Sequence, residues 1–365
     1  MNIENININI RNNKKGINMK RINNIIVSLL VSFAIATSAS AGALSVSGSA
    51  KATYGTMSGA NGDNTIGIAN ELAFGASGEL DNGWTWKYQT EIDNTAGAGS
   101  ADAVTDDSNL NITTPYGTVA ICVSECGLSA ALNFSADAYV LMSDAGYGEG
   151  KVEPSNISSY ANMQYHTPSG LLPFGIVGKI AYAPSGSTNM NSSNAQNTAK
   201  SATVGNTTMY RIEAAPIDGL ALNISYSESD GADVAGLTDE QKDEGGAIAG
   251  KYTTGPFTIG VGKAYSAIRL ADGTATDSAE SYINTNYSLG YSIGDNMSVS
   301  YTKEKSVQDK MTAATVTYDQ TTSSVQAAYT MGGMTLAIAR ADYDNVAYAN
   351  NVDAVETIFA VTMAF

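Results

Sequence analysis

The sequence has very little of what most catalytic and metal sites require. Among its 365 residues there are one histidine, His166, and two cysteines. A serine hydrolase needs a histidine beside its nucleophile, and the sequence offers neither a metal-spaced cluster nor a glycine-rich phosphate loop. We therefore expect no enzyme, no cofactor and no metal.

Long apolar runs are also missing beyond the N-terminus. No later stretch approaches the ~18 apolar residues of a membrane helix. Yet hydrophobic residues make up 43% of the chain and charged residues only 15%, which is too apolar for a disordered protein. If this chain crosses a membrane it must be a closed β-barrel, because only helices and barrels pair every backbone group in lipid.

The N-terminus is typical of a secretory signal. Lys20 and Arg21 precede the apolar run 25–36, and the small residues Ala39-Ser40-Ala41 follow it. This order predicts a signal peptide over 1–41 with cleavage after Ala41, and Met19 is an alternative start. A membrane anchor is the other interpretation, although the run is short for one.

Basic residues are scarce. Loss of 1–41 removes five of the 19 basic residues and one of the 35 acidic residues, which leaves 14 against 34. Such a negative chain repels nucleic acid and attracts cations. We expect no nucleic-acid partner.

The two cysteines are Cys122 and Cys126. An isolated pair in an exported protein favours a disulfide. Residues four apart in a regular strand lie ~13 Å apart, beyond bonding reach. The pair can therefore form a disulfide only if the strand ends between the two residues.

What the chain has in abundance is period-two alternation. One clear example has Leu220, Leu222, Ile224 and Tyr226 alternating with Ala221, Asn223, Ser225 and Ser227. This pattern predicts strands with one apolar and one polar face. A soluble sandwich would show the same pattern.

The connections discriminate between these folds, because short and long ones alternate. Tight turns are expected at 81–83, 115–117, 168–170, 216–219, 254–255, 294–296 and 331–333, and long polar loops at 56–65, 94–106, 126–158, 184–206, 229–244, 269–279, 306–320 and 344–353. Outer-membrane barrels have short periplasmic turns and long outer loops. Seven hairpins plus a first and a last strand predict an all-β, antiparallel up-and-down transmembrane barrel of sixteen strands over 42–365.

Aromatic residues follow the same rhythm. Tyrosines cluster toward the expected outer strand ends, and a second set lies near the tight turns: Tyr54, Tyr88, Tyr182, Tyr226, Tyr265, Tyr301 and Tyr343, then Trp84, Tyr116, Phe257, Tyr291 and Tyr329. Two girdles at the membrane interfaces would give this distribution.

Several segments resemble the general diffusion porins of Gram-negative bacteria. They are the first strand 44–50, the hairpins 77–85 and 114–120, the segment 162–168, and the C-terminal alternation that ends at Phe365. The resemblance implies a homotrimer in the outer membrane, with Phe365 read by the barrel-assembly machinery. It also implies that the third outer loop, 126–158, folds inward and narrows the pore. That loop lacks the family's Pro-Glu-Phe-Gly-Gly sequence.

Parity along the strands indicates which charges face the lumen. It turns Lys51, Lys87, Arg211 and Lys251 inward, and also Glu71, Glu79, Glu91 and Glu213. The third loop adds Glu125, Asp137 and Asp144, which could face the wall cations across the pore. Arg340 shares parity with Leu336 and Ile338, so it must lie at the interface, follow a bulge, or meet a trimer partner.

We therefore expect a passive channel for small hydrophilic solutes and ions that modestly prefers cations. Two alternatives stay open: a substrate-selective channel of the same architecture, and a non-conducting structural or adhesive surface barrel.

Overall fold

The computed structural model describes residues 42–59, 62–94, 103–123, 135–145, 157, 161–184, 204–231, 239–271, 279–311 and 316–365. No helix within these ranges is long and apolar enough to cross a membrane.

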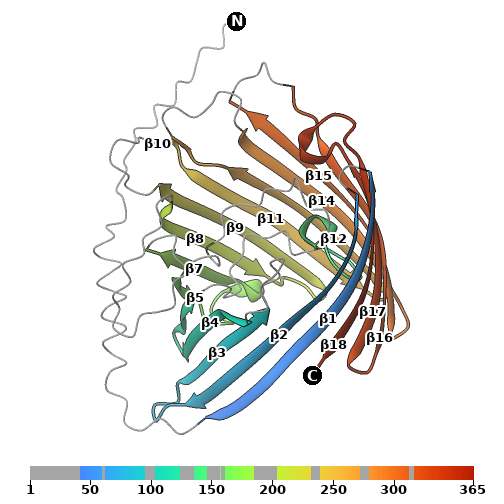
Figure 1. Ribbon diagram of the computed structural model, residues 1–365. Coiled ribbons are helices and arrows are strands. Elements are labelled where there is room, and N and C mark those ends of the chain that lie inside the picture. Colours follow the sequence, from blue (N-terminus) through green and yellow to red (C-terminus); the bar gives the residue numbers. More distant parts are fainter. Residues whose placement is uncertain are drawn as a thin grey trace, which may run out of the picture.

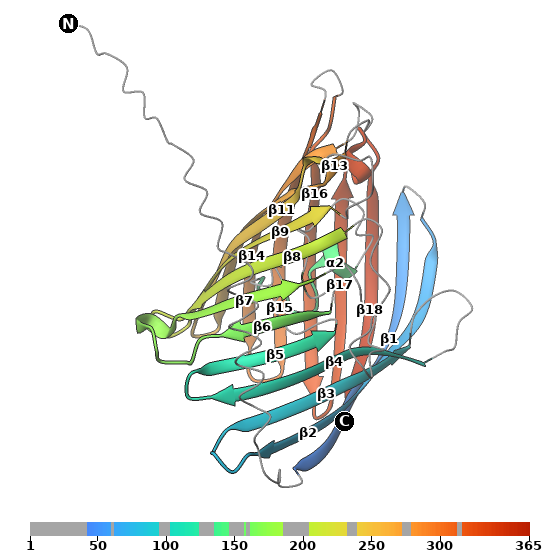
Figure 2. The same cartoon turned by 90° about the vertical axis from the view of Figure 1, so that its left-hand side faces the viewer.

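Sixteen strands form one closed antiparallel barrel (Figures 1 and 2). In chain order they are β1 (Ala43–Gly59), β2 (Asn64–Glu79), β3 (Thr85–Asn94), β4 (Ala103–Thr114), β5 (Gly117–Val123), β6 (Asn162–His166), β7 (Val177–Ala183), β8 (Val204–Ala214), β9 (Leu220–Gly231), β11 (Asp243–Thr254), β12 (Phe257–Ala267), β14 (Ala279–Ile293), β15 (Met297–Lys310), β16 (Gln320–Met331), β17 (Met334–Asp344) and β18 (Ala354–Ala364). Each strand pairs with its neighbour in the chain, and β1 pairs with β18 to close the wall. The expected strand number and topology are confirmed.

The small remaining elements are not part of the sixteen-stranded wall. The strands β10 (Asp239–Gln241) and β13 (Leu270–Ala271) pair with each other, and α2 (Met142–Ala145), η3 (Pro173–Gly175) and η4 (Val346–Tyr348) are single turns. Figure 2 shows α2 enclosed by the strands of the barrel.

All seven predicted tight turns join neighbouring wall strands. Gly219 shows why such turns need glycine. Its φ is 76°, and a Cβ there would lie 2.2 Å from the carbonyl oxygen of Thr253. A left-handed φ and a close backbone approach both exclude larger residues.

The predicted loops 56–65 and 306–320 were too long. β1 continues to Gly59 and β2 begins at Asn64, while β15 continues to Lys310. These strand ends are polar, so their side chains gave no alternation of apolar and polar residues. Backbone pairing continues there because it does not depend on apolar side chains.

The two faces of the wall differ in polarity. Along β9, Leu222, Ile224 and Tyr226 are exposed on the outside, whereas Asn223, Ser225 and Ser227 between them are buried. This arrangement is the reverse of a water-soluble protein, whose exposed face is polar. An apolar exterior around a polar interior is what a barrel in lipid requires.

The aromatic girdle is correct on most strands and wrong on β17. Tyr88, Tyr226, Tyr265 and Tyr301 are exposed on the outer face as expected. Tyr343 points inward and is fully buried, and its hydroxyl donates to the carbonyl of Met142 (3.3 Å) and to Glu356 (3.0 Å). Position near a strand end suggested a girdle residue, but strand parity decides the face.

Candidate functional site

The inner wall on one side of the barrel is lined by small, neutral, polar side chains. On β9, β14, β15 and β16 the buried inward residues include Asn223, Ser225, Ser227, Ser229, Asn284, Asn286, Ser288, Ser300, Thr302, Ser324 and Gln326. Serines and threonines are short, so they leave space beside the strands. Their hydroxyls can also hold water or a polar chain segment.

Residues 135–145 occupy part of that space. The backbone N–H groups of Ala136 and Ala138 donate to the hydroxyls of Ser288 and Ser300, both at 2.8 Å. The N–H groups of Tyr139 and Val140 both donate to Oε1 of Gln326 at 3.0 Å. The segment is thus fixed to three neighbouring strands, β14, β15 and β16, by its own backbone.

Gln326 also bonds in the other direction. Its Nε2 donates to the carbonyl of Val140 at 2.6 Å and to Oδ1 of Asp137 at 3.3 Å. One buried amide therefore satisfies two backbone N–H groups and one carbonyl of the segment. Buried backbone groups need such partners, so Gln326 is the principal anchor of residues 135–145.

Small residues let the segment lie close to the wall. A Cβ on Gly290 would lie 2.7 Å from the carbonyl oxygen of Ala136. Further round the wall, Tyr139, Val140 and Met142 pack against Ala339, Ala341 and their neighbours. Larger residues at these positions would push the segment toward the middle of the barrel.

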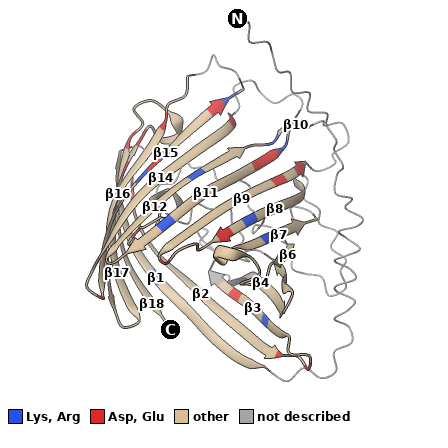
Figure 3. Cartoon of the chain, turned by 180° about the vertical axis from the view of Figure 1, so that it is seen from behind, with Lys and Arg blue, Asp and Glu red and all other residues tan. Residues whose placement is uncertain are grey.

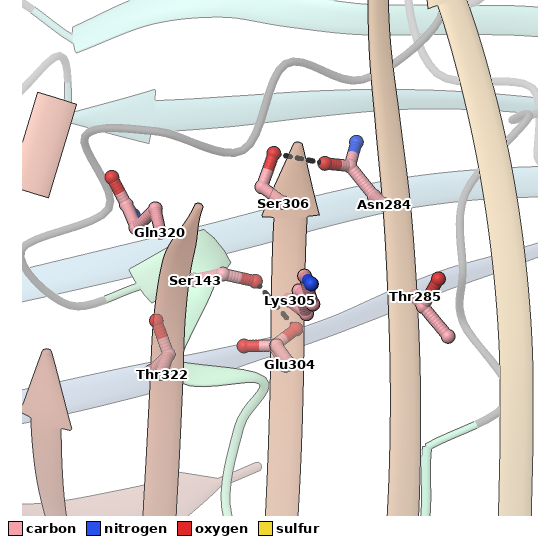
Figure 4. A pocket seen from close by; sticks show the side chains of 8 residues that line it. All are labelled: Ser143, Asn284, Thr285, Glu304, Lys305, Ser306, Gln320 and Thr322. Carbon is pink, nitrogen blue, oxygen red and sulfur yellow. Dashed lines mark hydrogen bonds between the residues drawn. The ribbon is translucent and has the colours of Figure 1, made fainter. Parts of the chain in front are cut away.

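A second contact joins α2 to β15. Ser143 donates to Oε1 of Glu304 at 2.8 Å, and Figure 4 shows the two side chains meeting between β14 and β16. The cavity beside them has a volume of about 20 Å³, which is room for a single water. We therefore interpret this place as packing and not as a ligand pocket.

The short turn η4 packs against the inner side of the wall next to this cavity. The hydroxyl of Tyr348 lies 2.7 Å from that of Ser306, and its ring centroid is 5.6 Å from that of Tyr282. Burial raises the pKa of Tyr348 to about 12. These tyrosines are committed to packing and do not form a free aromatic ladder.

The predicted lumen cations are all on the inner face. The register places Lys51 opposite Ala69 and Thr362, Lys87 opposite Ser77 and Asn111, and Lys251 opposite Ala221 and Gly260. Glu71 and Glu91 share this face on β2 and β3. Figure 3 shows charged residues spaced along β3, β7 and β8 among uncharged stretches.

Arg211 is paired, which parity alone does not reveal. Its Nε lies 2.9 Å from Oε1 of Glu213, and the same carboxylate accepts from Lys179 Nζ at 2.9 Å. Lys179, on the neighbouring strand β7, was missed by the sequence reasoning. Only the β7–β8 register, in which Lys179 faces Arg211, brings the three groups together.

The acidic residues predicted for the third loop are partly placed. Thr302 and Gln326 both donate to Asp137 Oδ1, and Asp144 lies in α2. Glu125 lies outside the described residues, as does Cys126. Cys122 is buried on the inner face of β5 and is not a free thiol.

Arg340 lies on the outer face. Its guanidinium is 3.5 Å from Oδ1 of Asp342, which shares that face. The register of β17 with β16 and with β18 is continuous, so a bulge is excluded as the explanation. An interface position or a subunit contact remains.

Comparisons with known proteins agree with this geometry. Residues 27–364 match the family described as Gram-negative porin, whereas no curated protein sequence matches. Among solved structures, OmpF of Salmonella typhi in complex with daunomycin superposes with a TM-score of 0.65 at 14% identity, covering 89% of this chain and 98% of that one.

Two further structures have the same fold. The anion-selective porin from Comamonas acidovorans gives a TM-score of 0.64, and the trimer form of in-vitro folded OmpT of Vibrio cholerae gives 0.62. Each is 13% identical, with 89% of this chain and 100% of that chain covered. This chain belongs to the Gram-negative porin family and resides in the outer membrane.

Proposed function

We propose that the barrel is a water-filled channel through which small hydrophilic solutes and ions diffuse passively. The observation that carries this proposal is the inner wall, where buried Asn, Ser, Thr and Gln side chains face inward on strand after strand. A polar lining keeps the lumen wet, and passive flow requires solutes to leave as readily as they enter.

We further propose that residues 135–145 narrow this channel from one side. The segment lies inside the wall and bonds to β14, β15 and β16. In the order of strands round the barrel, β5 and β6 lie opposite β15 and β16. The open part of the lumen therefore lies toward β3–β9.

Charge supports a modest cation preference. The anchored side carries Asp137, Glu304 and Glu356, while Lys87, Lys179 and Arg211 lie on strands across the lumen. Glu213 neutralises part of that cationic side. Cations would thus pass along the acidic side of the lumen and anions along the basic side. Because acidic residues outnumber basic residues in the chain, cations are favoured. The fold does not decide the sign, since an anion-selective porin shares it.

Planar-bilayer recording of the purified protein tests the channel. We expect stepwise conductance in KCl and, under a salt gradient, a reversal potential of the sign that indicates cation preference. The preference should weaken as salt rises, because the Debye length falls from ~8 Å at 0.15 M to ~3 Å at 1 M. A non-conducting protein would favour the structural or adhesive alternative, and an anionic sign would contradict the charge argument.

The substrate-selective alternative is weaker on this structure. Tyr282, Tyr343 and Tyr348 face inward but are buried in contacts with the chain's own residues. Catalysis is also not proposed: Gln164 contacts Nε2 of His166, on the inner wall beside Lys179 and Arg211. The imidazole thus contacts an amide oxygen, whereas the histidine of a triad bonds to a nucleophile and a carboxylate.

We also propose a homotrimer, a Cys122–Cys126 disulfide and cleavage after Ala41. The homotrimer is supported by a hollow of about 810 Å³ on the outer face of β1, β2, β17 and β18. Its lining is mostly apolar: Ala52, Tyr54, Ile66, Ile68, Leu336, Phe359 and Val361. OmpT of Vibrio cholerae is described in a trimer form. Cys122, which is buried and is not a free thiol, supports the proposed disulfide with Cys126. Outer-membrane lipid and the assembly machinery stay predicted partners.

Mass spectrometry of the exported protein tests all three together. Under native conditions we expect three times the chain mass. Under denaturing conditions we expect a chain that begins at Gly42 and is lighter than its reduced form by two hydrogen atoms. A monomer, an intact N-terminus, or no change on reduction would contradict the corresponding proposal.

A further inference from the structure

A hollow of about 460 Å³ lies in the inner wall on β2, β3 and β4, which are neighbours in the barrel (Figure 3). Its inward-facing lining residues, two on each strand, are Ser77, Glu79, Thr85, Lys87, Asn111 and Thr113. Glu79 ends β2 and Thr85 begins β3, on either side of the tight turn 81–83. The hollow therefore lies at the end of the barrel where the short turns are, which is the periplasmic mouth in barrels of this kind.

The strand register arranges these residues in two rows. One row across the three strands is Ser77, Lys87 and Asn111, and the row nearer the turns is Glu79, Thr85 and Thr113. Glu79 and Lys87 thus occupy diagonal positions on neighbouring strands, with Cα atoms ~7–8 Å apart. The hydroxyl side chains of Ser77 and Thr85 occupy the other two corners of the same rectangle.

The four corner side chains have no partner in the part of the chain that the structure describes. Neither Glu79 nor Lys87 has an opposite charge within ion-pair distance, and the hydroxyls of Ser77 and Thr85 make no hydrogen bond. All four are exposed to the lumen. An ammonium group and a carboxylate therefore face the same hollow without neutralising each other.

The residues of β4 behave differently. The amide nitrogen of Asn111 donates to Oδ1 of Asn109 at 2.7 Å, and the hydroxyls of Thr113 and Thr118 lie 2.9 Å apart. These bonds hold the third side of the hollow in place. The groups that are left to meet a solute are those of β2 and β3.

This arrangement favours a solute that carries both charges. A simple anion near Lys87 is repelled by Glu79, and a simple cation near Glu79 is repelled by Lys87. A small zwitterion can place its carboxylate against Lys87 and its ammonium group against Glu79, so it meets two attractions at once. The two hydroxyls can add hydrogen bonds to either end.

We propose that Glu79 and Lys87, with the hydroxyls of Ser77 and Thr85, form a weak binding site for small zwitterions of the amino-acid type. The Lys87 ammonium donates charge-assisted hydrogen bonds to the solute's carboxylate, and Glu79 accepts them from its ammonium group. The site is open to water, so binding is weak and exchange is fast, which passive flow requires. This inference rests on the proposed water-filled lumen and assigns a solute class to one part of it.

Saturation-transfer NMR on the full protein, purified in detergent, tests the site without any current. The probes are γ-aminobutyrate, which carries both charges, and butyrate and butylamine, which keep the same carbon chain with one charge each. We expect saturation transfer to γ-aminobutyrate with an affinity in the millimolar range. Butyrate and butylamine should each bind about tenfold more weakly, because each loses one charge-assisted hydrogen bond.

Variants of the two charged residues show whether they act as a pair. Glu79→Gln and Lys87→Gln should each weaken γ-aminobutyrate binding about tenfold. The exchanged variant E79K/K87E should bind it again, because both charges are still present and the solute can turn round. The matched control is Lys251→Gln, which removes an inner-wall lysine near another short turn, on β11, and should bind as the wild type does.

Three outcomes would overturn the proposal. Equal binding of γ-aminobutyrate and butyrate would indicate a site for single ions. Loss of binding in E79K/K87E would show that the two residues do not act as a pair. An equal loss in Lys251→Gln would attribute binding to the overall field of the lumen. If one single variant does not fold, the other provides the same comparison with E79K/K87E.

The channel and this site can fail separately. A protein that conducts but gives no saturation transfer to γ-aminobutyrate would contradict only the site. A protein that binds γ-aminobutyrate but does not conduct would contradict only the channel.

Discussion

Replacing Gln326 with leucine is expected to release residues 135–145 from the wall and to make the open channel noisy and more conductive. Leucine fills a similar volume, so the strand should keep its place. The variant leaves the N–H groups of Tyr139 and Val140 without their acceptor and the carbonyl of Val140 without its Nε2 donor.

The size of this effect follows from those three groups. Each buried backbone group left unpaired costs about 1–3 kcal/mol. Together they cost roughly 3 kcal/mol or more, which raises the detached population at least about a hundredfold. Single-channel recording should show the change as added current noise and a larger mean conductance.

Ser324→Ala is the matched control, because Ser324 is on the same strand and face and makes one long hydrogen bond to Gln326, at 3.3 Å. It should behave as the wild type. If Gln326→Leu gave quiet channels of unchanged conductance, either the segment would be held by other contacts or it would lie outside the path of the ions.

Replacing Glu213 with glutamine is expected to move ion selectivity toward anions. The carboxylate contacts Lys179 and Arg211 at 2.9 Å each, and the substitution removes its negative charge from beside both cations. One added charge about 6 Å from a passing ion in water is worth roughly 0.7 kcal/mol. The added charge raises the energy of a cation and lowers that of an anion by this amount, so the permeability ratio of cation to anion should fall about tenfold at low salt.

Glu228→Gln provides the control for this variant. Glu228 is also ion-paired, with Lys242 at 2.7 Å, but it lies on the outer face of β9 beyond Tyr226. Hydrogen bonds to Asp230 and to Glu228 raise the pKa of Lys242, so Lys242 stays charged at neutral pH. A reversal potential that moved equally in both variants would show that selectivity follows the charge of the whole protein and not that of the inner wall.

The wall of this protein could be predicted well from sequence because two local rules define it. Turn residues such as those around Gly219 and Gly255 marked the seven hairpins, and period-two parity turned Lys51, Lys87 and Lys251 inward. Both rules act over a few residues of chain. The same parity places Tyr343 inside, although its position near a strand end favours an outer girdle.

The site was less predictable because it depends on pairings between distant strands. The Glu213–Lys179 contact requires the β7–β8 register across a long connection. The sequence of residues 135–145 does not indicate that Gln326 anchors them, since that contact forms only in the closed barrel.

The anchoring of residues 135–145 also sets an order of events during folding. Ala136 and Ser288 are 152 residues apart in the chain, Tyr139 and Gln326 are 187 apart, and Met142 and Tyr343 are 201 apart. Contacts over such separations form only after the intervening chain has been ordered. The segment therefore has no partner until β14 to β17 are in place, and the lumen acquires its final cross-section last.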